Sequence, residues 1–281
     1  MKLAYVCTNY NSSADTVRAI ESLQANTRHE YHCIVVDNDS RPDQVALLRE
    51  QLATRPGVHV VFNADNLGYF AGLNVGLQRL KGTAPVFKHA IVGNNDLIFP
   101  PDFADAVAAR LALFDAYPVV SPTITTLNGA HQNPHVITGI SNLRERFYDL
   151  YHRDYHLALM LKWLVKQSRG RARRGDEDQH HKGQEIWQGH GSCYLFGPRF
   201  FAEFGELWAP TFLFGEEFFL SQQLEERALK VYFEPGISVV HACHSSVAQL
   251  PSRRHWELSR DAHRVYRQHN PIRPPDHGAK R

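Results

Sequence analysis

The stretch HAIVGNNDLIFPPDF, residues 89–103, shows the pattern on which the fold prediction rests. A short apolar run at 89–93 ends abruptly in the polar residues Asn94, Asn95 and Asp96. An uninterrupted apolar run of this length is typical of a strand buried on both faces, as in a parallel sheet covered by helices. Further runs of this kind lie on either side of it, at residues 3–7, 32–37, 58–62 and 119–121.

Between these runs, apolar residues recur at helical spacing. Leu73, Leu77 and Leu80, for example, fall on one face of a helix. The expected helices lie at residues 13–25, 42–53, 71–80 and 101–117. Strands that alternate with helices predict an α/β fold, with a mostly parallel, Rossmann-like sheet flanked by helices.

The composition is that of a globular protein with little net charge. The chain has 281 residues and a formal net charge of +2, so bulk electrostatics is not the main binding force. Residues 251–281 are the cationic part, with a helical pattern, eight basic residues and three acidic ones. Beyond Trp256 and Tyr266 this tail lacks the interleaved aromatic residues of a nucleic-acid binder, so we expect no nucleic-acid partner. We see neither a signal peptide nor an apolar run of about 18 residues, and expect a cytoplasmic protein, soluble or attached to a surface.

Residues 126–185 differ from the rest of the chain. Apolar residues at helical spacing over 143–165 are followed by the polar stretch KQSRGRARRGDEDQHHKG, residues 166–183, which we expect to be a mobile loop. An amphipathic helix that ends in basic residues could lie peripherally on an anionic membrane surface. Its apolar stripe could equally pack onto its own domain. The sequence leaves both possibilities open.

Several common site motifs are missing, and polar residues follow four consecutive strands instead. The chain has no P-loop and no G-x-S-x-G elbow, and the turn TNYNSSAD after the first strand lacks the glycines of a dinucleotide site. An open α/β sheet binds its ligand at the carboxyl ends of its strands. The polar residues there are Thr8, Asn9, Tyr10, Asp37, Asn38, Asp39, Asn66, Gly68, Gly72, Asn74, Asn94, Asn95 and Asp96. Asn11, Ser12 and Ser13 are expected to cap the helix that follows.

Five stretches in this order resemble family 2 of the nucleotide-sugar glycosyltransferases, which have the GT-A fold. They are YVCTNYN, VVDNDS, NLGYFAGLNVG, VGNNDLIFPPDF and the group GSCYLFGPRFF, FLFGEEFFL and VVHACHSS. The resemblance covers residues 3–125 and 186–246 and is closest to bacterial rhamnosyltransferase-like enzymes of cell-surface polysaccharide synthesis. It implies a GT-A domain at 1–250, with a nucleotide-binding half (1–125), a helical and basic insertion (126–185) and an acceptor and catalytic half (186–250). The basic helical tail, 251–281, follows.

The resemblance implies a nucleotide-sugar donor at the strand ends. Asp37 would accept a hydrogen bond from the base, which suits a uracil or thymine N–H, so the expected donor is a UDP- or dTDP-sugar. Gly68 would let the backbone approach the ribose and phosphate without a Cβ in the way. The other residues assigned to the nucleotide are Thr8, Asn9, Tyr10, Asp39, Asn66, Asn74 and Asn95.

Asn94, Asn95 and Asp96 occupy the place of the family's D-x-D metal motif. A divalent cation, Mn²⁺ or Mg²⁺, would neutralise the charge that develops on the leaving diphosphate. Asp96 is the only carboxylate of the three, and the resemblance adds Asn94 and His241 as metal contacts. A structural zinc site at His241-Ala-Cys-His244 is disfavoured because no second ligand cluster is evident in the sequence.

Glu216 and Glu217 lie where the family has its catalytic acidic pair. An inverting transferase needs one carboxylate to take the proton of the acceptor hydroxyl. Glu217 is the expected base, with Glu216 as the alternative. Trp187 and His190 are expected to line the acceptor pocket.

Together these features predict an inverting glycosyltransferase (hexosyl- or rhamnosyltransferase) that acts on a saccharide acceptor, lipid-linked, in O-antigen or capsule synthesis at the inner face of the cytoplasmic membrane. The alternative is a non-catalytic relative that binds a nucleotide sugar or polysaccharide, because Asn94 and Glu217 depart from the family pattern. A sugar-1-phosphate nucleotidyltransferase is disfavoured, since TNYNSSAD has neither glycine nor lysine.

Overall fold

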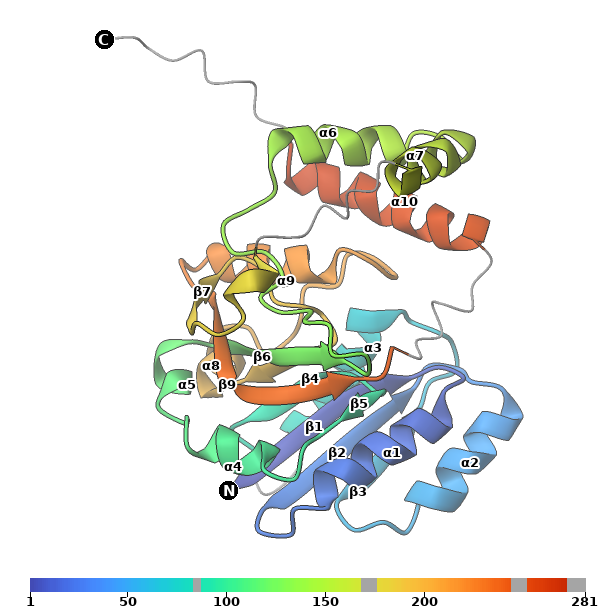
Figure 1. Ribbon diagram of the computed structural model, residues 1–281. Coiled ribbons are helices and arrows are strands. Elements are labelled where there is room, and N and C mark those ends of the chain that lie inside the picture. The colour runs from blue at the N-terminus through green and yellow to red at the C-terminus, as the bar shows by residue number, and fades with distance from the viewer. Residues whose placement is uncertain (83–86, 168–175, 244–251, 272–281) are drawn as a thin grey trace.

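A mixed sheet of nine strands forms the centre of the computed structural model, which describes residues 1–82, 87–167, 176–243 and 252–271 (Figure 1). The strands are β1 (Lys2–Asn9), β2 (Glu30–Asp37), β3 (Val58–Phe62), β4 (Ala90–Asn94), β5 (Leu97–Ile98), β6 (Val119–Thr126), β7 (Gln184–Ile186), β8 (Cys193–Phe196) and β9 (Val231–His241). Their order is β3-β2-β1-β4-β8-β6-β9-β5, and β7 pairs with β9. The five expected strands are β1, β2, β3, β4 and β6.

The direction of the strands changes in the middle of the sheet. β3, β2, β1 and β4 pair in parallel, as their continuous apolar runs predict. β8 then enters between β4 and β6 from the opposite direction and is antiparallel to both. β6 and β9 are parallel again, whereas β5 and β7 run antiparallel to β9. The mostly parallel sheet expected from the sequence is therefore found in the amino-terminal half, and the whole sheet is mixed.

Helices cover both faces of this sheet. They are α1 (Ser13–Gln24), α2 (Pro42–Leu52), α3 (Tyr69–Lys81), α4 (Phe103–Ala108), α5 (Leu113–Ala116), α6 (Asn142–Tyr151), α7 (Tyr155–Gln167), α8 (Pro198–Glu203), α9 (Glu216–Glu225) and α10 (Ser252–His269), with a 3-10 turn at Glu177–Gln179. The first three agree with the expected helices. The single helix expected at 101–117 is wrong: the chain turns between α4 and α5, and this lets Arg110 reach Glu234 of β9 at 2.8 Å.

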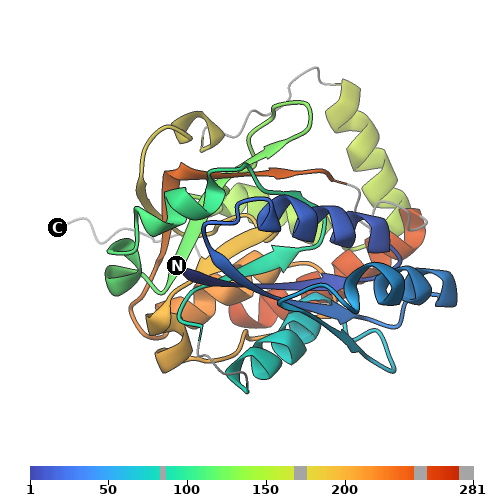
Figure 2. The same cartoon turned by 90° about the horizontal axis from the view of Figure 1, so that it is seen from below.

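Alternate residues of β1 pack into two separate apolar cores. Tyr5 belongs to the core between the sheet and α1, α2 and α4, and Val6 to the core between the sheet and α3, α8 and α9. Figure 2 shows α1 and α3 on opposite faces of the sheet. Coverage of both faces is the physical reason why these strands read as continuous apolar runs.

Helices α6, α7 and α10 form a further layer above the carboxyl ends of the strands (Figure 1). The helical pattern at 143–165 is two helices, α6 and α7, and both contact the helix of the carboxy-terminal segment. The Trp256 indole N–H donates to the carbonyl of Tyr151 at 3.1 Å, and Asp149 pairs with His263 at 2.7 Å and with Arg267. The insertion and the tail, far apart in the sequence, thus pack together.

Some sequence expectations fall outside the described residues. These are the central part of the loop expected at 166–183, the stretch 244–251 with His244, and the end of the tail at 272–281. Across the described parts of the chain, none of the helices has the length and apolar character needed to cross a membrane.

Candidate active site

A cavity of about 560 Å³ opens at the carboxyl ends of β1 and β4, below α9 and α10. Eleven of the residues expected at the site line it: Thr8, Tyr10, Asn66, Gly68, Asn94, Asn95, Asp96, His190, Glu216, Glu217 and His241. Asn38, a further polar residue expected at the strand ends, also lines it, as do residues that were not expected: Ser12, Tyr69, Gly191, Ser192, Phe212, Leu213, Phe214, Arg254 and Leu258. The fold therefore gathers strand ends, the start of α9 and one turn of α10 around a single space.

Asn9 and Asp37 lie beneath this cavity instead of lining it. Both are fully or almost fully buried, and the Asn9 amide donates to Asp37 Oδ1 at 2.7 Å. Asp37 also accepts from the backbone N–H of Ser40 at 3.2 Å. These bonds satisfy the buried carboxylate and join the ends of β1 and β2, so the pair supports the floor of the site.

Three other expected site residues also lie away from the cavity lining. The Asn74 amide makes two 2.8 Å bonds, to the backbone N–H and the carbonyl of Leu207, and so joins α3 to that loop. The Trp187 ring packs edge-to-face on Phe218, with ring centroids 6.1 Å apart. Asp39 is exposed in a turn with a φ of 61°.

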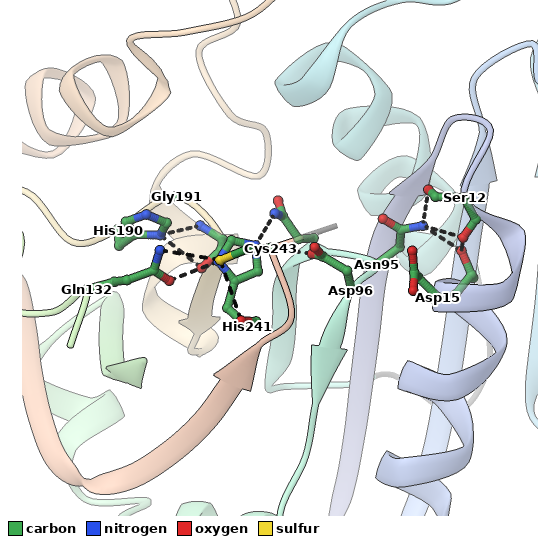
Figure 3. Close-up of polar contacts among 12 residues, drawn as sticks. Ser12, Asp15, Asn95, Asp96, Gln132, His190, Gly191, His241 and Cys243 are labelled. Carbon is green, nitrogen blue, oxygen red and sulfur yellow. Dashed lines mark hydrogen bonds and ion pairs between the residues drawn. The ribbon is translucent and has the colours of Figure 1, made fainter. Parts of the chain in front are cut away.

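Asn95 points away from its two neighbours, toward the start of α1 (Figure 3). Its amide donates to Ser12 Oγ at 2.8 Å and to Thr16 Oγ1 at 2.7 Å. Ser12 holds the N-cap position of α1, as expected, but its side chain makes no capping bond and instead receives the Asn95 amide. Ser13 likewise donates its hydroxyl to the carbonyl of Gln44 at 2.9 Å. Asn11 makes the turn before α1 with a φ of 56°.

Asp96 and His241 form a buried pair where β5 runs alongside β9. The carboxylate Oδ1 lies 3.2 Å from the imidazole Nε2, and Asn94 Nδ2 lies 3.1 Å from the same nitrogen. The other ring nitrogen, Nδ1, is 2.8 Å from Gln132 Oε1 (Figure 3). Because an amide oxygen only accepts, this contact places a proton on Nδ1 of His241, while Nε2 faces Asp96 and Asn94.

These residues fit a divalent cation that takes further ligands from a bound substrate. A carboxylate oxygen, an imidazole nitrogen and the Asn94 amide are donors that Mn²⁺ and, for the oxygens, Mg²⁺ accept. Among the residues that the structure describes, no group of three or more His, Cys, Asp or Glu side chains could hold a metal ion. Asp96 and His241 are only two such side chains, so a cation held by them would need further ligands from a bound substrate.

Glu216 and Glu217 begin α9 at the cavity wall and have opposite pKa shifts. Burial, with the charge of Glu217 second, raises the pKa of Glu216 to about 8. Burial also acts on Glu217, but His135, His190 and the N–H of Gly191 outweigh it and hold its pKa below the usual range. Two adjacent buried carboxyls cannot easily both ionise. Near neutral pH the pair therefore consists of an ionised Glu217 and a protonated Glu216.

The backbone before α9 is held in an unusual conformation. Phe214 has a φ of 74° and Gly215 a φ of 84°. Glu216 Oε1 accepts from the N–H of Phe214 at 2.8 Å, which closes this turn. Positive φ at a non-glycine residue is uncommon and concentrates at functional sites. The loop also meets Gly68, where a Cβ would overlap the carbonyl of Phe212.

Helix α10 contributes Arg254 and Leu258 to the cavity lining. Its neighbour His255 packs its ring on Phe214, with centroids 4.9 Å apart. The basic character of the tail was the one sequence signal for a charged residue at the site. The spacing of the residues in the tail did not connect it with the strand ends. The arrangement places a guanidinium group in a cavity that holds the Asp96–His241 pair and the two glutamates.

Comparisons with known proteins concern the family and the fold. Residues 6–169 match the sequence pattern of Glycosyl transferase family 2, more than half of the chain. The fold is similar to a crystal structure of GalNAc-T7 with UDP, GalNAc and Mn²⁺ (TM-score 0.54, 14% identity, 86% of this chain and 44% of that chain). It is also similar to S. aureus TarS 1–349 (TM-score 0.54, 12% identity, 86% of this chain and 60% of that chain).

The chain thus spans about half of the length of these solved structures, and at such identities the likeness shows the GT-A-like fold. No curated protein is similar enough in sequence to count as a relative. The family match and the GT-A-like fold agree with each other. The chain therefore belongs to glycosyl transferase family 2, whose members transfer a sugar from a nucleotide-sugar donor.

Proposed function

We propose that this chain is an inverting glycosyltransferase that moves a sugar from a UDP- or dTDP-sugar to a saccharide acceptor. The observation that carries the proposal is the pair at the start of α9. Glu217 is held ionised and Glu216 protonated, with both side chains at a cavity that also contains Asp96 and His241. A charged base beside a cation-binding pair is what this reaction needs.

In the transfer, the acceptor hydroxyl oxygen forms a bond to the anomeric carbon while the bond from that carbon to the diphosphate oxygen breaks. The nucleoside diphosphate leaves on the opposite side, and the hydroxyl proton passes to a base. Glu217 takes this proton, because its carboxylate is ionised. Glu216 already holds a proton, and its Oε1 accepts from the N–H of Phe214 at 2.8 Å. It therefore stabilises the turn that positions Glu217.

The donor occupies the strand ends. Asp96, His241 and Asn94 would hold Mn²⁺ or Mg²⁺, which when bound neutralises charge on the leaving diphosphate. Arg254, half-exposed and 3.7 Å from Glu257, adds a positive charge to the same cavity. Thr8, Tyr10, Asn66 and the backbone at Gly68 contact the nucleotide, and His190 contacts the acceptor. Asn9 and Asp37 support this surface from below.

The acceptor proposal rests on the motif resemblance to bacterial rhamnosyltransferase-like enzymes. It is a lipid-linked saccharide of a surface polysaccharide, such as O-antigen or capsule, at the cytoplasmic face of the membrane. The cavity volume of about 560 Å³ is that of one ordinary ligand site. A nucleotide and a disaccharide-sized acceptor therefore do not both fit inside it. The rest of an acceptor would extend toward α10.

The test combines binding and turnover. Melting temperatures are measured with UDP, dTDP, GDP, CMP and ADP, each with and without Mn²⁺, since a ligand of the folded state raises the melting temperature. We expect stabilisation by UDP or dTDP that increases with Mn²⁺. Hydrolysis of the matching nucleotide sugar is then compared for wild type, Glu217→Gln and Glu216→Gln.

Glu217→Gln should lower kcat by roughly 10²–10⁴ and leave nucleotide binding unchanged. A chain that binds the nucleotide sugar but turns over no faster than Glu217→Gln would instead be the non-catalytic binding relative. Absence of stabilisation by all five nucleotides would contradict the transferase proposal.

A further inference from the structure

Tyr69 begins helix α3 directly after Gly68, and its half-buried side chain lines the cavity of the candidate site. Burial, followed by the charges of Glu216 and Glu217, raises the pKa of Tyr69 well above its usual range. The phenol therefore keeps its proton near neutral pH and acts as a hydrogen-bond donor beside the acidic pair.

The main chain of Tyr69 holds the loop that leads into α9. Its backbone N–H donates to the carbonyl of Phe212 at 3.0 Å. Gly68 makes this approach possible, because it has a φ of 87° and a Cβ there would overlap the same carbonyl oxygen. Two residues further on, the N–H of Phe214 donates to Glu216 Oε1 at 2.8 Å. The start of α3 is thus connected to the first turn of α9 through one short loop.

The side chain of Tyr69 holds a second segment beside the acidic pair. Its hydroxyl donates to the carbonyl of Gly191 at 2.8 Å, across 122 positions of the chain. The N–H of the same glycine donates to Glu217 Oε1 at 3.1 Å. One side chain therefore anchors the residue whose N–H binds the Glu217 carboxylate.

Two neighbouring carbonyls, at Gly189 and Ser192, have partners of their own. They accept from the Tyr194 hydroxyl at 2.7 Å and from the backbone N–H of Asn94 at 2.8 Å, respectively. Loss of the Tyr69 hydroxyl would leave both of these bonds in place. It would therefore release one carbonyl of the loop and not the loop as a whole.

We propose that Tyr69 is a positioning residue of the transferase site, which acts through Gly191 to hold the Glu217 carboxylate where it meets the acceptor hydroxyl. The inference rests on the proposed function, because only a base that takes a proton needs this alignment. Displacement of a reacting group by about 1 Å can cost roughly 10²-fold in rate. Tyr69 directly follows Gly68, the residue assigned to the nucleotide, so the same turn meets the donor and orients the base.

The test compares Tyr69→Phe with Tyr194→Phe. Both substitutions remove one hydroxyl that donates to a glycine carbonyl of the same loop, and Tyr194 lies outside the described lining of the cavity. For each variant we measure the melting temperature, nucleotide affinity, and hydrolysis of the nucleotide sugar whose nucleotide stabilises the wild type. We expect Tyr69→Phe to lower kcat by about tenfold or more with unchanged nucleotide affinity, and Tyr194→Phe to retain kcat within about twofold.

Two results would overturn the proposal. The first is a kcat of Tyr69→Phe equal to that of the wild type. The second is an equal loss of kcat in the two variants, which would show a general loosening of the loop instead of a specific effect through Gly191.

The pH dependence of kcat gives a readout that a merely structural role would not move. The N–H of Gly191 favours the ionised form of Glu217, so a weaker bond raises the pKa of this carboxyl. Activity that requires the ionised carboxylate is then lost at a higher pH on acidification. We expect the acid limb of Tyr69→Phe to lie about 0.5–1 pH unit above that of the wild type, and that of Tyr194→Phe to stay in place. An acid limb of Tyr69→Phe at the wild-type position would contradict the proposal.

The other titratable groups that face Glu217 do not differ between the wild type and Tyr69→Phe. They are Glu216, His135, His190 and Tyr194. A change in the acid limb of Tyr69→Phe therefore reports on the bond that Tyr69 supports.

Failure of this proposal can be told apart from failure of the transferase function. The carboxyl carbon of Glu217, labelled with ¹³C and assigned by its loss in Glu217→Gln, titrates whether or not the chain turns over a substrate. A raised Glu217 pKa in Tyr69→Phe, in a chain that hydrolyses no nucleotide sugar, would support the link from Tyr69 to Glu217 and remove the transferase function. Turnover by the wild type that Tyr69→Phe leaves unchanged would do the reverse.

Discussion

The backbone N–H of Gly191 donates to Oε1 of Glu217 at 3.1 Å, and a Cβ on residue 191 would lie 2.8 Å from that same oxygen. Glycine at this position therefore does two things. It supplies a hydrogen bond that favours the ionised carboxylate, and it leaves the space in which the carboxylate lies. Tyr69 fixes the position of Gly191 by donating its hydroxyl to the Gly191 carbonyl at 2.8 Å.

Gly191→Ala should displace the Glu217 carboxylate. We expect kcat to fall by roughly 10–100-fold, because a misplaced base loses alignment with the acceptor hydroxyl, with little change in nucleotide affinity. Steady-state kinetics and nucleotide titration measure the two quantities. Gly82→Ala is the control, since a Cβ there meets nothing closer than 3.6 Å. Equal losses in both variants would contradict the role of Gly191.

The stability of the fold should depend on the protonation of Glu216. Its pKa is raised to about 8 from 4.5, so between these values the folded chain holds a proton that the unfolded chain has released. Stability from this group is complete below about pH 4.5 and is lost as the pH rises toward about 8, by at most about 1.4 kcal/mol per pH unit.

Glu216→Gln cannot ionise and should remove this contribution to the pH dependence. Urea unfolding at several pH values between about 5 and about 8 measures it. Glu226→Gln, at the exposed end of the same helix, should keep the wild-type slope. Identical slopes in all three proteins would show that Glu216 is ionised in the fold.

Asp96→Asn should abolish the part of nucleotide binding that depends on Mn²⁺. The substitution keeps the shape of the side chain but removes the carboxylate charge next to His241. Gln132→Leu, which removes the acceptor for His241 Nδ1, should weaken Mn²⁺ binding by about 10–100-fold. Both effects are read from calorimetric titration of Mn²⁺ in the presence of UDP. Asp102→Asn is the exposed control, and Mn²⁺ binding that survives Asp96→Asn would rule out this site.

Arg254→Ala should weaken binding of the diphosphate more than binding of the nucleoside. Arg254 lines the cavity from α10 with its side chain 59% exposed, whereas the adjacent Arg253, 72% exposed, lies over the Tyr155 ring. We expect affinity for UDP to fall by about tenfold while affinity for uridine is unchanged, since a phosphate contact is worth about 1–3 kcal/mol. Arg253→Ala provides the matched comparison, and equal behaviour of the two variants would remove Arg254 from the site.

The sequence alone determined much of the sheet and several site residues. Buried parallel strands need continuous apolar runs, and these are local features that can be read one segment at a time. The polar residues after those runs are local as well, and strand ends must meet at one edge of the sheet. Asn94 and Asp96 were found in this way, whereas Glu217 was assigned from the motif resemblance.

Tertiary structure decided which of these polar residues face the cavity. Asn9 and Asp37 satisfy each other beneath it, Asn95 turns toward Ser12, and Asn74 is taken by the backbone of Leu207. Such partners lie 28 to 133 residues apart along the chain, and no local pattern shows them. An Asn or Asp side chain can cap a helix, join two segments or bind a ligand. Its neighbours in the fold select which of these roles it has.

For the same reason, the sequence did not predict that α6, α7 and α10 pack into one layer. An amphipathic pattern predicts a helix but leaves open what covers its apolar side. Packing of Trp256 against Tyr151 joined the tail to the insertion and brought Arg254 to the cavity. Leu164 and Trp163 follow the same spacing rules as a buried stripe, and only the folded chain shows that they are exposed.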